Sequence, residues 1–234
     1  CQNCGFSQVR INGLEGQYSQ ILIDGKAIYS SLNGVYGLDQ IPTNMIERIE
    51  AVRGGGSSLY GGNAIAGVVN VITKTPSYDS YNASWDNMMV NGRIPDNSVN
   101  FNGTLVSDDQ RMGASLFGML NSRHEYDSDD DGFSEISRMK VQTFGSKLFW
   151  KMSSKSKLET EIHTIHHEAR GGNKIDMLPH QADIAEYVKH ETIVAQTSYK
   201  QYVGKADILN VFASGQLTDR SSYYGANQDI NAYG

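Results

Sequence analysis

Four carboxylates that lie close together in the sequence are spaced as calcium ligands are. Asp127, Asp129 and Asp131 alternate with other residues and are followed at once by a glycine. This D-x-D-x-D-G pattern arranges oxygen ligands around a sharp turn, and Glu135 at the ninth position supplies a fourth oxygen. The twelfth position of an EF-hand is a bidentate Glu, whereas this chain has Arg138 there. We predict a loop that binds Ca²⁺ and is stiffened by it, with an acidic solvated loop as the alternative.

A second group of metal-binding residue types consists of His163, His166, His167 and Glu168. On a strand, His163 and His167 would share one face and His166 would take the other. The helical H-E-x-x-H pattern of zinc hydrolases is not present in the sequence. We interpret the group as a polar strand end near a membrane surface. The alternatives are a ligand for haem iron and a zinc enzyme that holds stoichiometric metal at His163 and His167.

Both cysteines fall in the short segment Cys1-Gln2-Asn3-Cys4. A zinc site would need two further ligands nearby, and a redox pair would normally begin a helix next to a strand. Neither context is evident, so a short-range structural disulfide of an exported protein is favoured.

The charged residues Glu47, Arg48, Glu50 and Arg53 form another group that could do chemistry. Catalysis would need a nucleophile, a general base and an orienting partner that occur together, and the sequence offers no such set. We therefore predict that the protein is not an enzyme and that it requires no cofactor.

The composition of the chain limits the partners that it can have. Its 234 residues carry 20 basic and 26 acidic side chains, a formal net charge of −6, which gives a nucleic-acid partner little support. Only 39% of residues are hydrophobic, and no run approaches the ~20 apolar residues of a membrane-spanning helix. A transmembrane β-barrel remains compatible, because only every second residue of its strands faces lipid.

The first third of the chain reads as a small α+β unit. We predict strands at 9–14 and 20–25, an amphipathic helix start at 42–49, and a short strand at 49–52. A glycine-dense turn and a strand at 67–74 close the unit; such glycine density indicates positive φ angles and close backbone approach. A phosphate-binding loop is excluded, since no Lys-Ser or Lys-Thr follows the glycines and a strand comes next.

Beyond residue 74 the pattern changes to alternating strands. About seven are predicted, each near the ~9–11 residues that a tilted strand needs to cross a bilayer. They lie at about 78–90, 99–106, 111–120, 141–152, 158–167, 192–202 and 206–217. Tight turns at 107–110, 153–156 and 203–205 alternate with the longer connections 91–97, 123–138 and 167–191. Short connections on one side and long ones on the other are typical of an up-and-down barrel.

The segment 41–74, IPTNMIERIEAVRGGGSSLYGGNAIAGVVNVITK, resembles the closing motif of the plug domain of TonB-dependent outer-membrane receptors. The stretches IERIE, VRG, LYG and NVITK all match the family pattern in register. The strands near 9–14 and 20–25 resemble two earlier plug strands. The opening C-x-x-C-G-F is similar to a Bacteroidetes-type subgroup of these receptors.

The resemblance implies a fold and a place in the cell. Residues 1–76 would be the C-terminal part of an α+β plug, with a small mixed sheet and short helices. Residues 77–234 would be the first antiparallel strands of a transmembrane β-barrel, about 7 of the roughly 22 strands of the family. The chain would then be a fragment, without its export signal, its energy-coupling box or most of its barrel. The full protein would lie in the outer membrane of a Gram-negative bacterium.

The resemblance also implies a function. It predicts active, TonB-dependent uptake of a scarce metal chelate, namely cobalamin, haem or a ferric siderophore. The partners would be the TonB complex (through a missing N-terminal segment), the chelate, outer-membrane lipid and a surface lipoprotein. The alternatives are uptake of a glycan or a peptide, and a passive or adhesive barrel that binds calcium.

Cargo contacts in the family come from plug loops that face outward. Two such loops fall at 13–19 and 29–37, and the second resembles the apex loop that touches cobalamin in vitamin B12 receptors. The predicted contacts are Gln17, Tyr18, Asn33, Val35 and Tyr36, with an ordinary surface loop as the alternative.

Two further features are interpreted through the family. The segment 170–186 resembles a barrel loop whose first expected role is packing and whose second is gating. The plug charges at 47–53 would form internal salt bridges and pair with the barrel wall, and breaking such contacts would let cargo pass.

Overall fold

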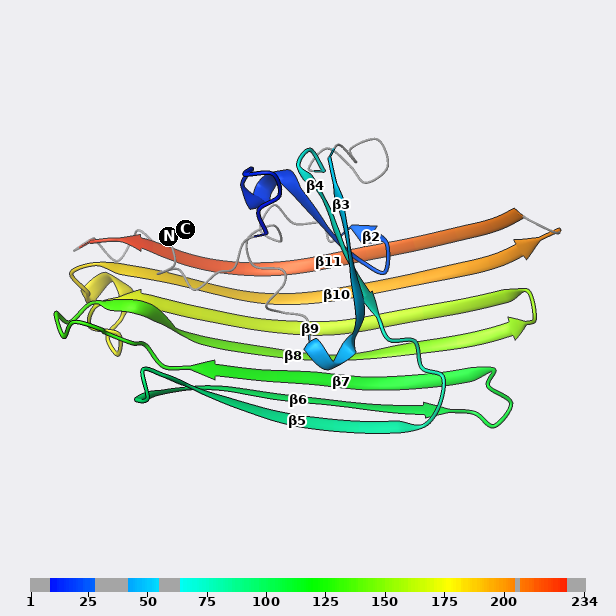
Figure 1. Ribbon diagram of the computed structural model, residues 1–234, viewed down its shortest axis with the longest axis horizontal. Coiled ribbons are helices and arrows are strands. Elements are labelled where there is room, and N and C mark those ends of the chain that lie inside the picture. The colour runs from blue at the N-terminus through cyan, green and yellow to red at the C-terminus, as the bar shows by residue number, and fades with distance from the viewer. Residues whose placement is uncertain (1–8, 28–41, 55–63, 205–206, 227–234) are drawn as a thin grey trace.

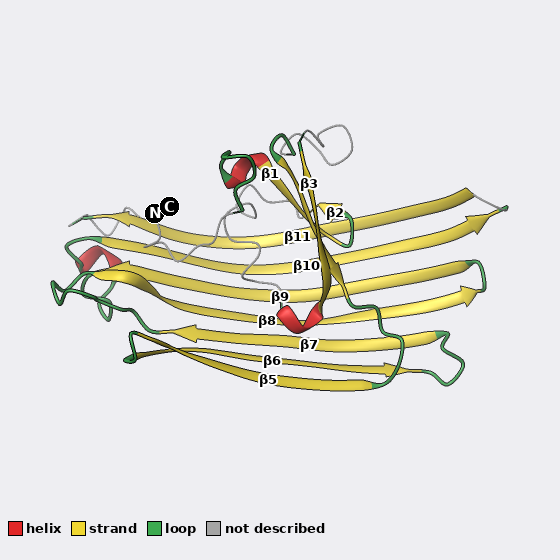
Figure 2. Cartoon of the chain, viewed as in Figure 1, coloured by secondary structure: helices red, strands yellow, loops and turns green. Residues whose placement is uncertain are grey.

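The chain forms two β-sheets joined by a short connection (Figures 1 and 2). The computed structural model describes residues 9–27, 42–54, 64–204 and 207–226. The helices are η1 (Gly16–Tyr18), η3 (Thr43–Met45) and η4 (Pro179–Gln181), and the strands are β1 (Ser19–Ile23), β2 (Lys26–Ala27), β3 (Ile46–Arg53), β4 (Gly67–Thr73), β5 (Ser80–Val90), β6 (Ile94–Val106), β7 (Met112–Arg123), β8 (Ser134–Ser153), β9 (Ser156–Gly172), β10 (Ala185–Val203) and β11 (Asp207–Gly225). Within these ranges no helix has the length and apolar character needed to cross a membrane.

The small sheet has four strands in the order β2-β1-β4-β3. Its two central strands, β1 and β4, run parallel, and both are mostly buried. Leu22 and Val68 from these strands form a core with Ala64. Central strands that are covered on both faces carry continuous apolar runs, as in ILI and VV here. This explains why the sequence predicts these strands well.

Two local backbone features shape the small sheet. The turn between β1 and β2 consists of Asp24 and Gly25 with φ angles of 50° and 76°, which is the two-residue type I′ hairpin that Asp-Gly favours. At Gly67, φ is +153°, and a Cβ atom there would collide with the carbonyl oxygen of Val52. A glycine is therefore required where β4 passes β3 most closely.

The predicted helix at 42–49 is wrong. A single 3-10 turn, η3, is followed at once by β3, which pairs with β4. A β-bulge lies between Ile46 and Arg48, so one extra residue interrupts the period of two. In the sequence, Ile46 and Ile49 are three residues apart, which imitates helical spacing.

The predicted strand at 9–14 is also wrong. Ile11 and Leu14 form only an isolated bridge, and Asn12 and Gly13 between them have φ angles of 55° and 78°. Two consecutive residues with positive φ make a tight turn rather than a strand. The other upstream strand is confirmed as β1.

The large sheet has seven antiparallel strands in sequence order, from β5 to β11. All seven predicted strands are present. Tight connections join β6 to β7 and β8 to β9 at one end, where β10 also ends and β11 begins; we call it the turn end. Residues 91–93, 124–133 and 173–184 connect strands at the other end, the loop end. The sheet is open, with β5 and β11 at its edges.

The strands from β8 onward are longer than predicted. β8 has 20 residues, β9 has 17, and β10 and β11 have 19 each. The additional residues lie mostly at the loop end, where polar side chains occur on both faces. Hydrogen-bonded pairing continues there without the apolar alternation on which the prediction depended.

The two faces of the large sheet differ in polarity. Because the sheet is pleated and the register is known, each residue can be assigned to the face of Lys147 or to the opposite face. The face away from Lys147 carries exposed apolar side chains: Tyr81, Trp85, Phe101, Leu105, Leu116, Phe144, Leu148, Trp150, Ile162, Ile193, Val211 and Leu217. The face of Lys147 is mainly polar and includes Asn100, Thr104, Ser115, Thr143, Glu161, His163, His167, His190, Thr192 and Gln196. This division is typical of a transmembrane barrel wall.

The small sheet lies on the polar face, and its strands cross those of the large sheet (Figure 1). η3 lies against β6, and an ion pair joins the β1–β2 turn to β8. The segment between β4 and β5 holds the predicted boundary after residue 76.

Candidate functional site

The contact between the two sheets is built around the side chain of Asp24. The type I′ turn places this residue beside the end of β4, where its own backbone N–H bonds to the carbonyl oxygen of Val71 at 3.0 Å. The Asp24 carboxylate accepts two bonds from Thr73. The Thr73 backbone N–H donates to Oδ1 at 2.9 Å, and the Thr73 hydroxyl donates to Oδ2 at 2.6 Å. The carboxylate is thus held by its own sheet.

Lys147 of β8 completes the contact from the large sheet. Its Nζ donates to Oδ2 of Asp24 at 2.9 Å and to the hydroxyl oxygen of Thr73 at 2.7 Å. The lysine is 5% exposed, so solvent screens this pair little. We call Asp24, Thr73 and Lys147 the clasp.

The clasp controls the charge of Asp24. Burial alone would raise the pKa of this carboxyl. The positive charge of Lys147 and the hydrogen bonds from Thr73 outweigh burial, and the net pKa lies below its usual value. Asp24 is therefore ionised at neutral pH, and the ion pair is present under physiological conditions.

A second carboxylate lies next to the clasp on the large sheet. Glu161 of β9 stands directly opposite Lys147 in the register of β8 and β9. Its Oε1 is 3.1 Å from Nδ1 of His163, and its Oε2 accepts a bond of 2.9 Å from the amide of Gln196. A row of polar side chains therefore crosses β8, β9 and β10 on the face that carries the small sheet.

The plug charges singled out from the sequence do not make this contact. Arg48 pairs with Glu47 at 3.0 Å and with Glu50 at 2.9 Å, and all three side chains are about half exposed. Exposed pairs of this kind contribute little to stability. In the described ranges, the ion pair that joins the two sheets is that of Asp24 and Lys147.

The histidine group divides as the strand interpretation predicts. His163 and His167 face the small sheet, whereas His166 points to the opposite face and pairs with Glu191 at 2.7 Å. The register also brings His190 of β10 beside His167, with ring centroids 5.8 Å apart. His167 and His190 are almost fully buried, as expected of wall packing. The described residues place no third metal-binding side chain with them.

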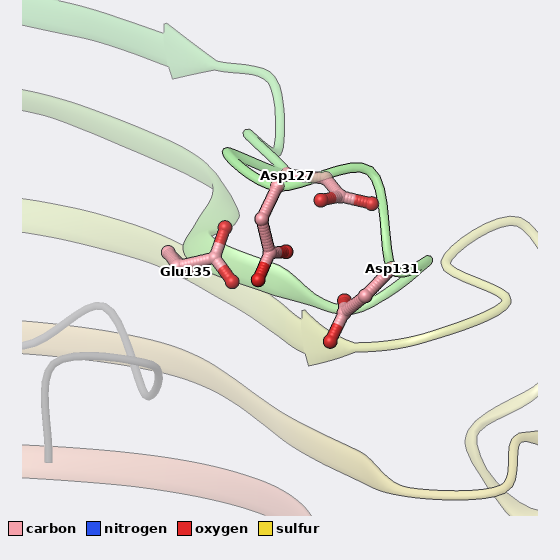
Figure 3. A group of neighbouring side chains, drawn as sticks. Asp127, Asp131 and Glu135 are labelled. Atoms are coloured by element: carbon pink, nitrogen blue, oxygen red, sulfur yellow. The ribbon is translucent and has the colours of Figure 1, made fainter.

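The acidic loop brings its four predicted ligands together. One carboxylate oxygen from each of Asp127, Asp129, Asp131 and Glu135 lies within 4.8 Å of the others, and Figure 3 shows the side chains of Asp127, Asp131 and Glu135 converging. Oxygens around Ca²⁺ lie ~2.3–2.6 Å from the ion, so oxygens on opposite sides are roughly 5 Å apart. The geometry fits the ion.

Backbone hydrogen bonds already order this loop. Both oxygens of Asp127 accept backbone N–H bonds of 2.7 Å, from Asp130 and Gly132. Glu135 accepts the N–H of Ser128. A carboxylate oxygen has a second lone pair, which remains available to a cation. Calcium binding by this loop stays a prediction.

The loop that follows β9 is held by its own polar groups. Arg170 donates to the carbonyl oxygens of Gly171 and Asn173. The Asn173 side chain donates to Asp183 at 2.7 Å and accepts from the backbone N–H of Asp183 at 3.0 Å. These bonds agree with the first expected role of this segment, which is packing.

The predicted cargo residues fall at two places. Gln17 and Tyr18 belong to η1, just before β1, and Tyr18 is 38% exposed. Asn33, Val35 and Tyr36 lie outside the described residues, as do Cys1 and Cys4.

A groove of about 640 Å³ lies on the apolar face of the large sheet. Phe144, Ile193 and Leu217 line it, together with the pair of His166 and Glu191. These side chains point away from the small sheet. The groove therefore lies on the opposite side of the wall from the small sheet.

Sequence reasoning missed Lys147, Glu161 and the role of Asp24. A signal for the first two was present. Each is a charged residue in the middle of a strand, and Lys147 is followed by Leu148 and Phe149. Charges at such positions need a partner inside the fold. The sequence could not show which partner each one meets.

Comparisons with known proteins agree with this architecture. Residues 1–68 match the TonB-dependent receptor plug domain. A stretch of 67 residues is 43% identical to the vitamin B12 transporter BtuB of Vibrio vulnificus and covers 29% of this chain and 11% of that protein. A stretch of 166 residues is 30% identical to the iron-regulated outer membrane virulence protein of Vibrio cholerae, covering 66% of this chain and 24% of that relative.

The fold is similar to that of solved receptors. The siderophore receptor PirA from Pseudomonas aeruginosa superposes with a TM-score of 0.69 over 94% of this chain and 36% of its own, at 20% sequence identity. This similarity concerns the fold alone. The chain covers at most about a quarter of the two curated relatives described above, and the Bacteroidetes-type resemblance stays a prediction. On the plug match, residues 1–68 belong to the TonB-dependent receptor plug domain family, and the antiparallel wall behind them has the fold of solved receptors.

Proposed function

We propose that the chain is part of an active transporter that imports a scarce metal chelate across the outer membrane of a Gram-negative bacterium. The observation that carries the proposal is a plug-like sheet fastened by the clasp to the polar face of a wall whose other face is apolar. In this arrangement residues 1–76 act as the plug and residues 77–234 as the first part of the barrel wall.

The two faces of the wall explain why such a protein needs energy. The apolar face places the strands in lipid, and the polar face encloses a lumen that the plug fills. Cargo passes only when the plug moves, and moving it breaks buried polar contacts such as the clasp. The TonB complex would supply this work by pulling on a segment N-terminal to the plug.

The cargo class follows from the relatives. One is named a vitamin B12 transporter and another an iron-regulated outer membrane protein, and several solved neighbours are siderophore receptors. Cobalamin and ferric siderophores are therefore proposed cargo, and the sequence resemblance adds haem. Glycans and peptides are the alternative. Contact would come from Gln17, Tyr18, Asn33, Val35 and Tyr36, because aromatic and amide groups suit a large, flat, mostly uncharged chelate. A surface lipoprotein is a further candidate partner.

We also propose that the acidic loop binds Ca²⁺ at the loop end of the wall. The convergence of Asp127, Asp129, Asp131 and Glu135 supports this proposal. The ion would stiffen the loop and would take no part in chemistry, and transport itself requires no cofactor.

The test of the transport proposal is a binding screen followed by growth. The full-length receptor is titrated with cobalamin, haem and ferric siderophores, and the gene is deleted in its host. The expected result is submicromolar binding of one chelate. Growth on that chelate at limiting concentration should be lost both in cells that lack TonB and in the deletion strain. Unchanged growth on all three chelates would overturn the cargo assignment.

The rival functions give different outcomes. A passive or adhesive barrel that binds calcium predicts uptake or adhesion that does not depend on the energy complex. A zinc enzyme predicts one equivalent of zinc retained by His163 and His167 after refolding. Metal analysis of the purified receptor separates this last possibility from transport.

A further inference from the structure

Lys147 lies between two carboxylates that belong to different sheets. Asp24 bonds to it from the plug at 2.9 Å. Glu161 stands directly opposite it on the neighbouring strand of the wall, on the same face of the sheet. Directly opposed residues of an antiparallel pair have Cβ atoms roughly 4.5–5.5 Å apart, which is within reach of a flexible lysine side chain.

We propose that Glu161 is the second partner of Lys147, and that Lys147 exchanges Asp24 for Glu161 when the plug leaves the wall. Glu161 is then a positioning residue for transport, since it acts through Lys147 and does not touch cargo. The inference rests on the proposed movement of the plug. The inference adds that Glu161 is the group that makes this movement reversible.

The plug side of the clasp keeps its own hydrogen bonds on separation. Both bonds from Thr73 to Asp24 lie within the small sheet, so they move with it. The carboxylate therefore leaves the wall still bonded at both oxygens. A buried ion pair is costly to break when one charge is left without a partner, and this arrangement avoids that cost for Asp24.

On the wall, the carboxylate of Glu161 is likewise held by hydrogen bonds from its own sheet. His163 and Gln196 hold the two oxygens of Glu161, and both residues belong to wall strands that stay in place. They keep the carboxylate next to Lys147 whether or not the plug is present. Glu159, the next carboxylate on this face, is already paired with Lys157 at 2.9 Å and is not a competitor.

A second cation accompanies Asp24 on the plug. Lys26 lies two residues after Asp24, in the second strand of the β1–β2 hairpin. On separation the plug takes Asp24 and Lys26 together, and the wall keeps Lys147 and Glu161 together. Each side therefore keeps one cation and one anion of these four residues.

The experiment measures plug release in the full-length receptor held in lipid nanodiscs, with constant force applied to the N-terminus. We expect Glu161→Gln to slow release by about 10-fold, because the separated state loses one charge-assisted pair. Lys147→Met should speed release. In the Lys147→Met background, Glu161→Gln should have no further effect.

The matched control is Glu159→Gln, which removes a carboxylate from the same face of the same strand, and release should match that of the parent. The folded electrophoretic mobility of the barrel shows that each variant is folded. Release that is unchanged or faster in Glu161→Gln would overturn the proposal, and so would slowing that persists without Lys147. Because the measurement needs no uptake, a receptor that imports no chelate would refute the transport function without affecting this result.

Discussion

Removing the amine of Lys147 should weaken the attachment of the plug to the wall. Lys147→Met keeps most of the side-chain volume but deletes the ammonium group that bonds to Asp24 and Thr73. Loss of one partner of a buried ion pair costs ~3–5 kcal/mol. Two features reduce that cost here. Asp24 keeps both bonds from Thr73, and its side chain is 21% exposed. We therefore expect the free energy of plug unfolding to fall by about 2 kcal/mol, a factor of about 30.

The assay is native-state hydrogen exchange of the full-length receptor in nanodiscs. Amides of β4 exchange through unfolding of the plug, so their exchange should be about 30-fold faster in the variant, while peptides from the wall remain unchanged. The control is Lys151→Met, because Lys151 lies on the same strand and the same face but is exposed. Equal exchange of β4 in both variants would refute the assignment of Lys147 as the residue that holds the plug.

Three further outcomes are expected. The pKa of Asp24 is depressed in the folded protein, so the stability that Asp24 contributes is fully present above the ordinary pKa of 3.8 and is lost as pH falls below it. The protection of β4 amides from exchange should lack this pH dependence in Asp24→Asn. The same pH profile in the variant and the parent would contradict the linkage. Calorimetry should detect Ca²⁺ binding that disappears in the Asp129→Ala, Asp131→Ala double variant, and an identical titration in that variant would discard the calcium site. On the apolar face, Leu148→Arg should lower the free energy of unfolding in liposomes, measured by urea titration, by ~2–4 kcal/mol. Gln142→Arg, nearer the loop end, should lower it by only ~0–1 kcal/mol. Equal losses in the two variants would mean that the apolar band does not face lipid.

The proposed function assigns different roles to the two faces of the wall. The apolar face, where the rings of Phe101 and Phe144 meet with centroids 6.2 Å apart, would set the position in lipid. The polar face would hold the plug. A variant on one face should therefore alter membrane stability, and a variant on the other should alter plug release, with little crossover between the two effects.

Much of this fold could be predicted from local patterns. The seven wall strands follow from alternation, the tight turns follow from short polar connections, and the β1–β2 hairpin follows from Asp24 and Gly25. The convergence of the four acidic side chains was also predictable, because they lie within nine consecutive residues and depend on one local turn. Opposite faces for His163 and His166 follow from the pleat alone.

The sequence alone was insufficient where pairing between distant strands decides the outcome. The bulge beside Ile46 exists only because β3 pairs with β4. Without knowledge of this pairing, the segment was predicted to be a helix. The long ends of β8 to β10 are stabilised by neighbouring backbones rather than by a recognisable side-chain pattern.

The clasp is the clearest case of a feature that tertiary structure decided. Asp24 and Lys147 are 123 residues apart in the sequence, and neither residue type nor spacing indicates that they meet. The motif at 41–74 indicated the family, while local turns and a period of two determined the wall strands and the polarity of their faces. Which charges become partners depends on how one sheet is laid across the other, and that placement is fixed only when both are folded together.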